Sequence, residues 1–239
     1  DLTVSSVIRD SNSATVVNKY GAGTLALTTQ STHTGGTTVY NGTLDLVGQN
    51  ILYGSGGLGN GSALTVDGSN SLVKLSATGI NAMSTIGPLT LKNGGTFTDN
   101  GPAGGLHSVY APVVFDGGGT MTSEVAGNGG FGNFLFISGI TVTDTAGLAT
   151  ISADSISFNY SQTIDVGDSA AGSGTDLLIS SSIRNERVGT ITKNGTGKVT
   201  LSGANVDTSA WAINSGTLEV QNGSAIGNAA AVTVNSGGT

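Results

Sequence analysis

The residue pair best suited to acid–base chemistry is Asp165 and Asp168, which stand at the two ends of an Asp-Val-Gly-Asp segment. Cleavage of a glycosidic bond uses two carboxyl groups about 5–10 Å apart, and a turn can hold two Asp side chains at that spacing. Enzymes of this kind that act on acidic sugars also need cationic groups, and the nearest in sequence are Arg184 and Arg187. We expect the two carboxylates to be solvated turn residues, with a polysaccharide lyase or hydrolase as the alternative function.

The two histidines, His33 and His107, are the other candidates for proton transfer. Neither is accompanied by a Gly-x-Ser-x-Gly nucleophile motif. His33 falls where an internal repeat, described below, places a turn, and Asp207 is its counterpart in the second copy. We therefore predict an exposed turn residue there, no catalytic residue in the chain, and no enzymatic activity.

Metal and cofactor motifs are missing as well. The absence of Cys excludes thiolate metal sites and disulfides, and the scattered carboxylates Asp144 and Asp154 belong to no calcium-loop motif. Gly-rich strings such as Gly117-Gly-Gly119 lack the Lys of a phosphate loop and are interpreted as turns. We predict no cofactor and no metal.

Aromatic residues gather in the middle of the chain, where segments 99–112 and 126–136 interrupt the strand pattern. Four of the six Phe lie between residues 115 and 136. A loop leaving the body of the protein would present such side chains for stacking on sugars or proteins. The candidate ligand-binding residues are His107, Tyr110, Phe131 and Phe134. The alternative is that these rings pack inside the fold or seal a hairpin onto it.

The elements that would position these residues are β-strands. Gly, Thr, Ser and Asn supply 119 of the 239 residues, whereas Glu, Lys, Arg and Gln supply only 15. A helical protein would need those straight-chain residues on its exposed faces. Disorder is excluded because only 10% of residues are charged while 37% are hydrophobic.

Short stretches of alternating apolar and polar residues recur along the chain, and this period of two is typical of half-buried strands. Examples are 24–27, 43–46, 63–66, 89–91, 141–143, 149–151, 155–158, 190–192, 198–201, 217–220 and 232–234. Between them lie Asn-Gly, Asp-Gly and Ser-Gly turn signals.

Strands this short, with Thr, Ser and Asn rather than charges outside, favour a solenoid over a sandwich, because a solenoid has open edges only at its ends. The predicted fold is an all-β, right-handed parallel β-helix with short loop or hairpin insertions. At twenty-odd residues a turn we expect about ten or eleven turns and a rod of about 50 Å. Threonine pairs at 120–122, 141–143 and 190–192 are unevenly spaced, which argues against an ice-binding array.

Internal repetition divides the rod into three parts. Lys19-Tyr-Gly-Ala-Gly-Thr-Leu-Ala-Leu27 recurs as Lys193-Asn-Gly-Thr-Gly-Lys-Val-Thr-Leu201, and three further matches accompany it in the same order. The prediction is a single elongated domain over 1–239, with repeated modules at 1–70 and 176–239 and a central segment at 71–175.

The charge excludes some partners. The net charge is −7 and the pI is about 4.4. Lys and Arg total eight without a basic patch, so we expect neither nucleic-acid binding nor attraction to anionic membranes. No apolar run reaches the ~20 residues that span a bilayer, so this segment is not expected to insert into one. Because the sequence begins at Asp1, we expect a processed or excised segment.

The first module resembles the autotransporter-associated β-strand repeat. It reads Gly21-Ala-Gly23-Thr-Leu25-Ala-Leu27, then Gly35-Gly-Thr-Thr-Val39, then Gly42-Thr-Leu-Asp-Leu46. The second module is more divergent and has Ser209-Ala-Trp-Ala-Ile213 in place of the Gly-Gly-Thr-Thr-Val strand.

The resemblance implies a passenger region of a bacterial autotransporter, displayed outside the outer membrane of a Gram-negative cell. Such passengers resemble parallel β-helices, and many are adhesins or mediate aggregation and biofilm formation. The implied partners are a host-cell, matrix or glycan surface, or a second rod by self-association.

Overall fold

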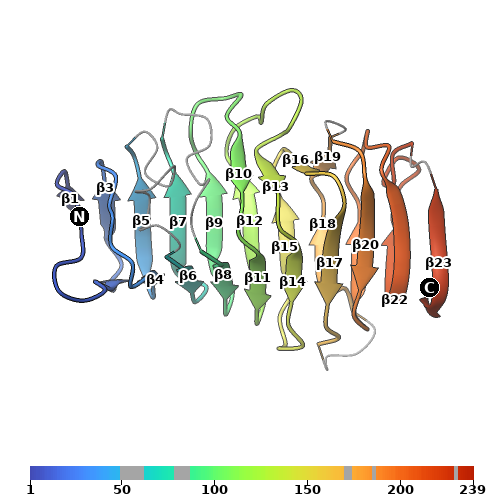
Figure 1. The fold of residues 1–239 in the computed structure, drawn as a ribbon, viewed down its shortest axis with the longest axis horizontal. Helices are drawn as coiled ribbons and strands as arrows, with labels where there is room; N and C mark the ends of the chain where they lie inside the picture. The colour runs from blue at the N-terminus through green and yellow to red at the C-terminus, as the bar shows by residue number, and fades with distance from the viewer. Residues whose placement is uncertain (49–61, 78–86, 170–173, 185–186, 229–230) are drawn as a thin grey trace.

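The chain forms a rod of stacked parallel strands, and the computed structural model describes residues 1–48, 62–77, 87–169, 174–184, 187–228 and 231–239. Within those ranges there are strands, turns and bends but no helix. The strands follow one another along the long axis from the N-terminus to the C-terminus (Figure 1). The predicted parallel β-helix is confirmed as a β-solenoid of about nine turns.

Two long faces run the length of the rod, and each contains ten strands among the described residues. The first face consists of β1 (Leu2–Val4), β3 (Thr24–Leu27), β5 (Gly42–Leu46), β7 (Ser71–Leu75), β9 (Thr96–Asp99), β12 (Gly119–Ser123), β15 (Ala149–Ser152), β18 (Leu177–Ile179), β21 (Lys198–Leu201) and the second half of β22 (Ala210–Val220). The second face consists of β2 (Val17–Lys19), β4 (Thr37–Val39), β6 (Leu64–Asp67), β8 (Leu89–Lys92), β11 (Val113–Asp116), β14 (Ile140–Val142), β17 (Gln162–Val166), β20 (Thr190–Asn194), the first half of β22, and β23 (Val232–Gly238). Ten strands about 4.8 Å apart give a face of about 43 Å.

The turn length varies along the rod. The register pairs Leu25 with Leu44 in a short turn near the N-terminus, but it pairs Met121 with Ile151 across a much longer turn in the middle. Loops absorb the difference, so residues at uneven spacing still stack. Thr96, Thr120 and Thr150 form one outward column in this way, and uneven spacing is therefore no argument against a threonine column.

A third, four-stranded parallel sheet covers one side of the middle of the rod. It consists of β10 (His107–Val109), β13 (Phe134–Phe136), β16 (Ser155–Phe158) and β19 (Ser182–Ile183). The prediction that 99–112 and 126–136 are loops is therefore wrong in part, because each segment ends in or contains a strand of this sheet. The stretches before β10 and β13 do project from the rod, at the top of the view (Figure 1).

The core is a narrow column of inward-facing side chains. Most are Val, Leu and Ile, and the largest fully buried side chains among the described residues include Trp211, Phe97, Phe115, Phe134 and Phe136. Rings from different strands meet inside, with centroids 6.0 Å apart for Phe97 and Phe134 and 5.6 Å for Phe136 and Phe158. Burying each such side chain contributes about 2–3 kcal/mol. These phenylalanines therefore hold the wider middle of the rod together.

Candidate functional site

The two carboxylates predicted as the best acid–base pair are both exposed. Asp165 lies on β17 of the second face, and Asp168, two residues after the end of β17, lines a groove with Asp176, Lys198 and Glu219. Lys198 Nζ lies 3.0 Å from Glu219 Oε2, and this interaction holds the pKa of Glu219 below its usual value. A catalytic acid needs a raised pKa instead, so Glu219 does not fit the role of the acid in glycosidic cleavage.

The oxygens of Asp176 already have partners. Oδ1 accepts hydrogen bonds from the backbone N–H and the hydroxyl of Ser169, at 3.1 and 2.7 Å, and Oδ2 accepts the Lys198 N–H at 2.7 Å. Asp144 and Asp154 are both exposed, and Asp154 Oδ2 accepts hydrogen bonds from Gly127 and Ser155. The hydrogen-bonded carboxylates Asp154 and Asp176 therefore stabilise turns.

The prediction of an exposed turn at His33 and Asp207 is wrong. His33 is 0% exposed and Asp207 is 4% exposed. His33 Nε2 lies 2.9 Å from the Thr37 hydroxyl, and burial lowers the pKa of His33 despite the charge of Asp10. Burial raises the pKa of Asp207, and hydrogen bonds from Ser209 oppose that rise. Inside the rod each side chain is held by a neighbouring hydroxyl, His33 by Thr37 and Asp207 by Ser209.

A buried lysine joins two successive turns in each repeat. Lys19 Nζ donates to the carbonyl oxygens of Tyr20, Gly21 and Asn41, at 3.0, 2.5 and 3.0 Å. The first two carbonyls belong to the lysine's own turn and the third belongs to the next one. We call this arrangement the lysine staple.

The second repeat contains the same staple. Lys193 Nζ donates to the carbonyl oxygens of Asn194, Gly195 and Ser215, at 2.9, 2.7 and 3.0 Å. Burial lowers the pKa of Lys193 to about 8, although the charges of Asp165 and Asp176 oppose this shift. The amine is therefore still protonated at pH 7, and its three N–H donors match three carbonyl acceptors.

The staple requires glycine at the residue that follows its third acceptor, which is Gly42 in the first repeat and Gly216 in the second. Gly42 has a φ of +76° and Gly216 has a φ of +67°. An added Cβ at Gly42 would clash with the carbonyl oxygens of Gly21 and Gly23 and would lie 2.7 Å from Lys19 Nζ. The Gly-x-Gly and Gly-Thr-Leu motifs of the repeat therefore allow the backbones of two successive turns and the lysine ammonium to lie close together.

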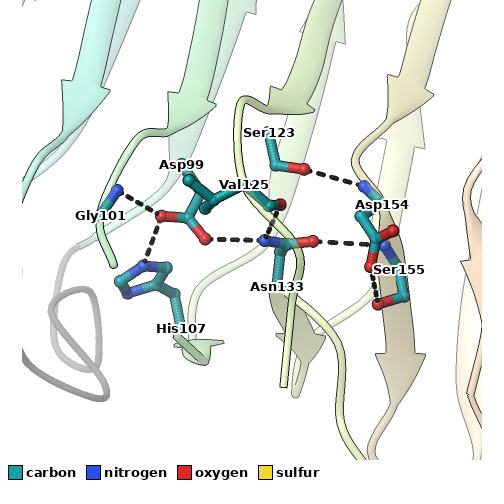
Figure 2. A network of polar contacts seen from close by, with 8 residues as sticks. All are labelled: Asp99, Gly101, His107, Ser123, Val125, Asn133, Asp154 and Ser155. Atoms are coloured by element: carbon teal, nitrogen blue, oxygen red, sulfur yellow. Dashed lines mark hydrogen bonds and ion pairs between the residues drawn. The ribbon is translucent and has the colours of Figure 1, made fainter. Parts of the chain in front are cut away.

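The corner between the first face and the third sheet is closed by a buried polar network. Figure 2 shows it running from Asp99 through Asn133 to Ser155. Asp99 Oδ2 accepts the Asn133 side-chain N–H at 2.8 Å, and Asn133 Oδ1 accepts the Ser155 N–H at 3.2 Å. Asp99 Oδ1 accepts the Gly101 N–H at 3.0 Å and lies 3.3 Å from His107 Nε2. The network joins strands of three successive turns.

Asp99 and His107 are 0% and 1% exposed. Burial acts to raise the pKa of Asp99, but the hydrogen bond and charge of His107, with the N–H groups of Asn133 and Gly101, outweigh it and hold the pKa below 3.8. Because both side chains are enclosed in the rod, the carboxylate–imidazole contact holds the corner together rather than facing a substrate.

The lowered pKa of Asp99 predicts how stability depends on pH. Because the pKa of Asp99 is lower folded than unfolded, its stabilisation is present above pH 3.8 and is lost as the pH falls through the folded pKa. Replacing Asp99 with Asn is expected to cost about 2 kcal/mol at pH 7. In urea unfolding at pH 7 and pH 3, the difference from the parent chain should shrink at pH 3. An equal difference at both values would contradict an ionised Asp99.

The predicted ligand-binding residues separate into two groups. His107 and Phe134 face the core, where their ring centroids are 6.1 Å apart, so neither reaches a ligand at the surface. Tyr110 is exposed and Phe131 is half-buried, and both line a groove over the third sheet. The interpretation of loops sealed onto the rod fits Phe131, whose carbonyl oxygen accepts a hydrogen bond from the Ser157 hydroxyl.

Tyr160 and Arg187 are among the residues of this groove that sequence reasoning missed. Tyr160 follows β16 with a φ of +57°, and Arg187 is 27 residues further along the chain. The solenoid turn brings them together. The closeness of Arg184 and Arg187 in sequence was the only available signal.

Among the described residues no group of three or more His, Cys, Asp or Glu is placed to hold a metal ion. No helix in the same ranges has the length and apolar character needed to cross a membrane.

The geometry thus defines a parallel β-solenoid that contains two copies of a lysine-stapled unit. Comparison with protein families identifies the unit. The passenger-associated-transport repeat matches residues 17–46, which cover β2 to β5, and residues 191–220, which end with β22. The match confirms the resemblance to an autotransporter passenger repeat. No curated protein and no solved structure matches the chain.

Proposed function

We propose that the chain is part of the passenger rod of a bacterial autotransporter, displayed outside the outer membrane of a Gram-negative cell. In this proposal it acts as an adhesin or aggregation rod that binds host or neighbouring-cell surfaces. The observation that carries the proposal is the passenger-associated-transport repeat at two equivalent places in one solenoid. A rod supported by backbone ladders and staples presents its loops away from the cell, which suits contact with another surface.

Catalysis receives less support than contact. Glu219 has a lowered pKa, and Asp207, whose pKa is raised, is enclosed in the rod. Neither Glu219 nor Asp207 therefore fits the solvent-accessible acid with a raised pKa that a polysaccharide lyase or hydrolase would use.

The adhesive proposal predicts that fluorescent beads coated with purified chain will adhere to cultured epithelial cells or to immobilised matrix. Adhesion should exceed that of albumin-coated beads several-fold, since many rods on one bead act together. Bead–bead clumping in the same experiment measures self-association. Coated beads that neither adhere nor clump above the albumin control would contradict both forms of the proposal.

A further inference from the structure

An aromatic groove with a single cation runs along the outer side of the third sheet. It has a volume of about 390 Å³, and its lining includes Tyr110, Phe131, Leu135, Tyr160 and Arg187. These residues lie on or next to β10, β13, β16 and β19, so the groove extends over successive turns along the rod axis. Its shape suits an extended ligand that lies parallel to the rod.

Arg187 is held in place by the two rings beside it. Its guanidinium carbon lies 5.8 Å from the centroid of Phe131 and 5.2 Å from that of Tyr160. Its Nη1 donates a hydrogen bond of 2.9 Å to the Tyr160 hydroxyl. Cation–π contacts of this kind orient the guanidinium before any ligand arrives, and this lowers the entropic cost of binding.

In the described part of the chain, Nη1 of Arg187 donates to Tyr160 and Nε is enclosed without a hydrogen-bond partner, so a ligand would reach the guanidinium through its Nη atoms. A guanidinium recognises a carboxylate through two parallel N–H donors. Arg187 is the only charged residue among the described residues that line the groove, so an arriving carboxylate meets no opposing carboxylate there.

The tyrosines supply flat surfaces for a sugar ring. Tyr110 is 49% exposed and Tyr160 is 55% exposed. Aromatic faces pack against the C–H groups of a sugar ring while hydroxyl groups stay hydrated at its edge. The net charge of −7 disfavours a densely sulfated polymer, which the rod would repel at long range. A single arginine matches a polymer of lower charge density, which carries one carboxylate on each sugar or on every few sugars.

We infer that this groove binds an acidic glycan, with a sugar carboxylate on Arg187 and sugar rings on Tyr110 and Tyr160. The inference rests on the proposed adhesive function and specifies its ligand class. Uronic and sialic acids share this chemistry, so both are used as probes.

The test measures binding of the purified chain to tetragalacturonate, to 3′-sialyllactose, to carboxyl-reduced tetragalacturonate and to a heparin tetrasaccharide by calorimetry. We expect at least one carboxylated sugar to bind about tenfold or more tightly than the reduced sugar and the heparin fragment, since one charge-assisted contact is worth about 1.5–3 kcal/mol. Arg187→Gln should remove that preference, and Tyr110→Ala should weaken binding of every sugar. Arg184→Gln is the matched control, because Arg184 does not line the groove.

Circular dichroism and urea midpoints establish that each variant is folded. Equal affinity for carboxylated and reduced sugars, preferential heparin binding, or binding unchanged in folded Arg187→Gln would overturn the inference. If neither of the two carboxylated sugars binds, the inference is overturned too. The bead assay separates the two proposals. If parent and Arg187→Gln beads adhere equally and the sugars do not bind, only the groove proposal is overturned. If the sugars bind but the beads do not adhere, only the adhesive function is overturned.

Discussion

Replacing Lys193 with methionine is expected to lower the free energy of unfolding by about 3 kcal/mol, because three part-buried carbonyl acceptors lose their donor at about 1 kcal/mol each. Methionine keeps most of the volume of the side chain, so packing changes little. Lys193 is 0% exposed, and its three acceptors lie on two successive turns. The measurement is the urea midpoint and slope followed by circular dichroism.

Lys198→Met is the matched control for the staple. Lys198 lies five residues away, is partly exposed and pairs with Glu219 at 3.0 Å. A solvent-exposed ion pair of this kind contributes little to stability because water and salt screen it. Lys19→Met should reproduce the larger effect in the first repeat, since the same three contacts recur there. Equal destabilisation by Lys193→Met and Lys198→Met would show that the staple does not stabilise the fold.

The second large effect is expected at the corner glycine. Gly42→Ala should cost more than about 3 kcal/mol, because it adds both left-handed strain and a clash with carbonyl oxygens and Lys19 Nζ. Gly21 has the same φ of +76°, but a Cβ added to it meets nothing within 4 Å. Gly21→Ala should therefore cost only about 1–2 kcal/mol.

The comparison of Gly42 with Gly21 separates the destabilisation caused by the steric clash from the destabilisation caused by the backbone conformation. Thermal and urea unfolding of the two alanine variants measure it directly, and Gly216→Ala should match Gly42→Ala. If Gly21→Ala and Gly42→Ala were equally destabilising, conformation alone would explain the glycines of the repeat, and the close approach at the staple would have no energetic role.

The strands of the rod were predictable from the sequence because each is a local pattern. Alternation at 155–158 and 198–201 coincides with β16 and β21. The segments that begin at Lys19 and Lys193 repeat in sequence, and each of them contains a lysine staple with the same three kinds of contact.

The buried polar residues were not predictable, because the strand register determines their partners and those partners are far away in the sequence. Asp99 and Asn133 are 34 residues apart, and Lys19 and Asn41 are 22 apart. When only the local sequence is considered, a polar residue next to Gly is typical of an exposed turn. The uneven length of the solenoid turns hides which of them stack, and for the same reason the groove between Tyr160 and Arg187 was invisible in the sequence.

Staples, polar network and groove all depend on one claim, that the turns stack in parallel in the observed register. Because the chain has no Cys, disulfide trapping tests this directly. Thr120 and Thr150 are register partners on the first face, whereas Thr141 lies on the second face. The variant with Thr120→Cys and Thr150→Cys should oxidise to an intramolecular disulfide, since register partners have Cα atoms about 5 Å apart. The variant with Thr120→Cys and Thr141→Cys should stay reduced although its cysteines are closer in sequence. Closure of the second pair in place of the first would contradict the register.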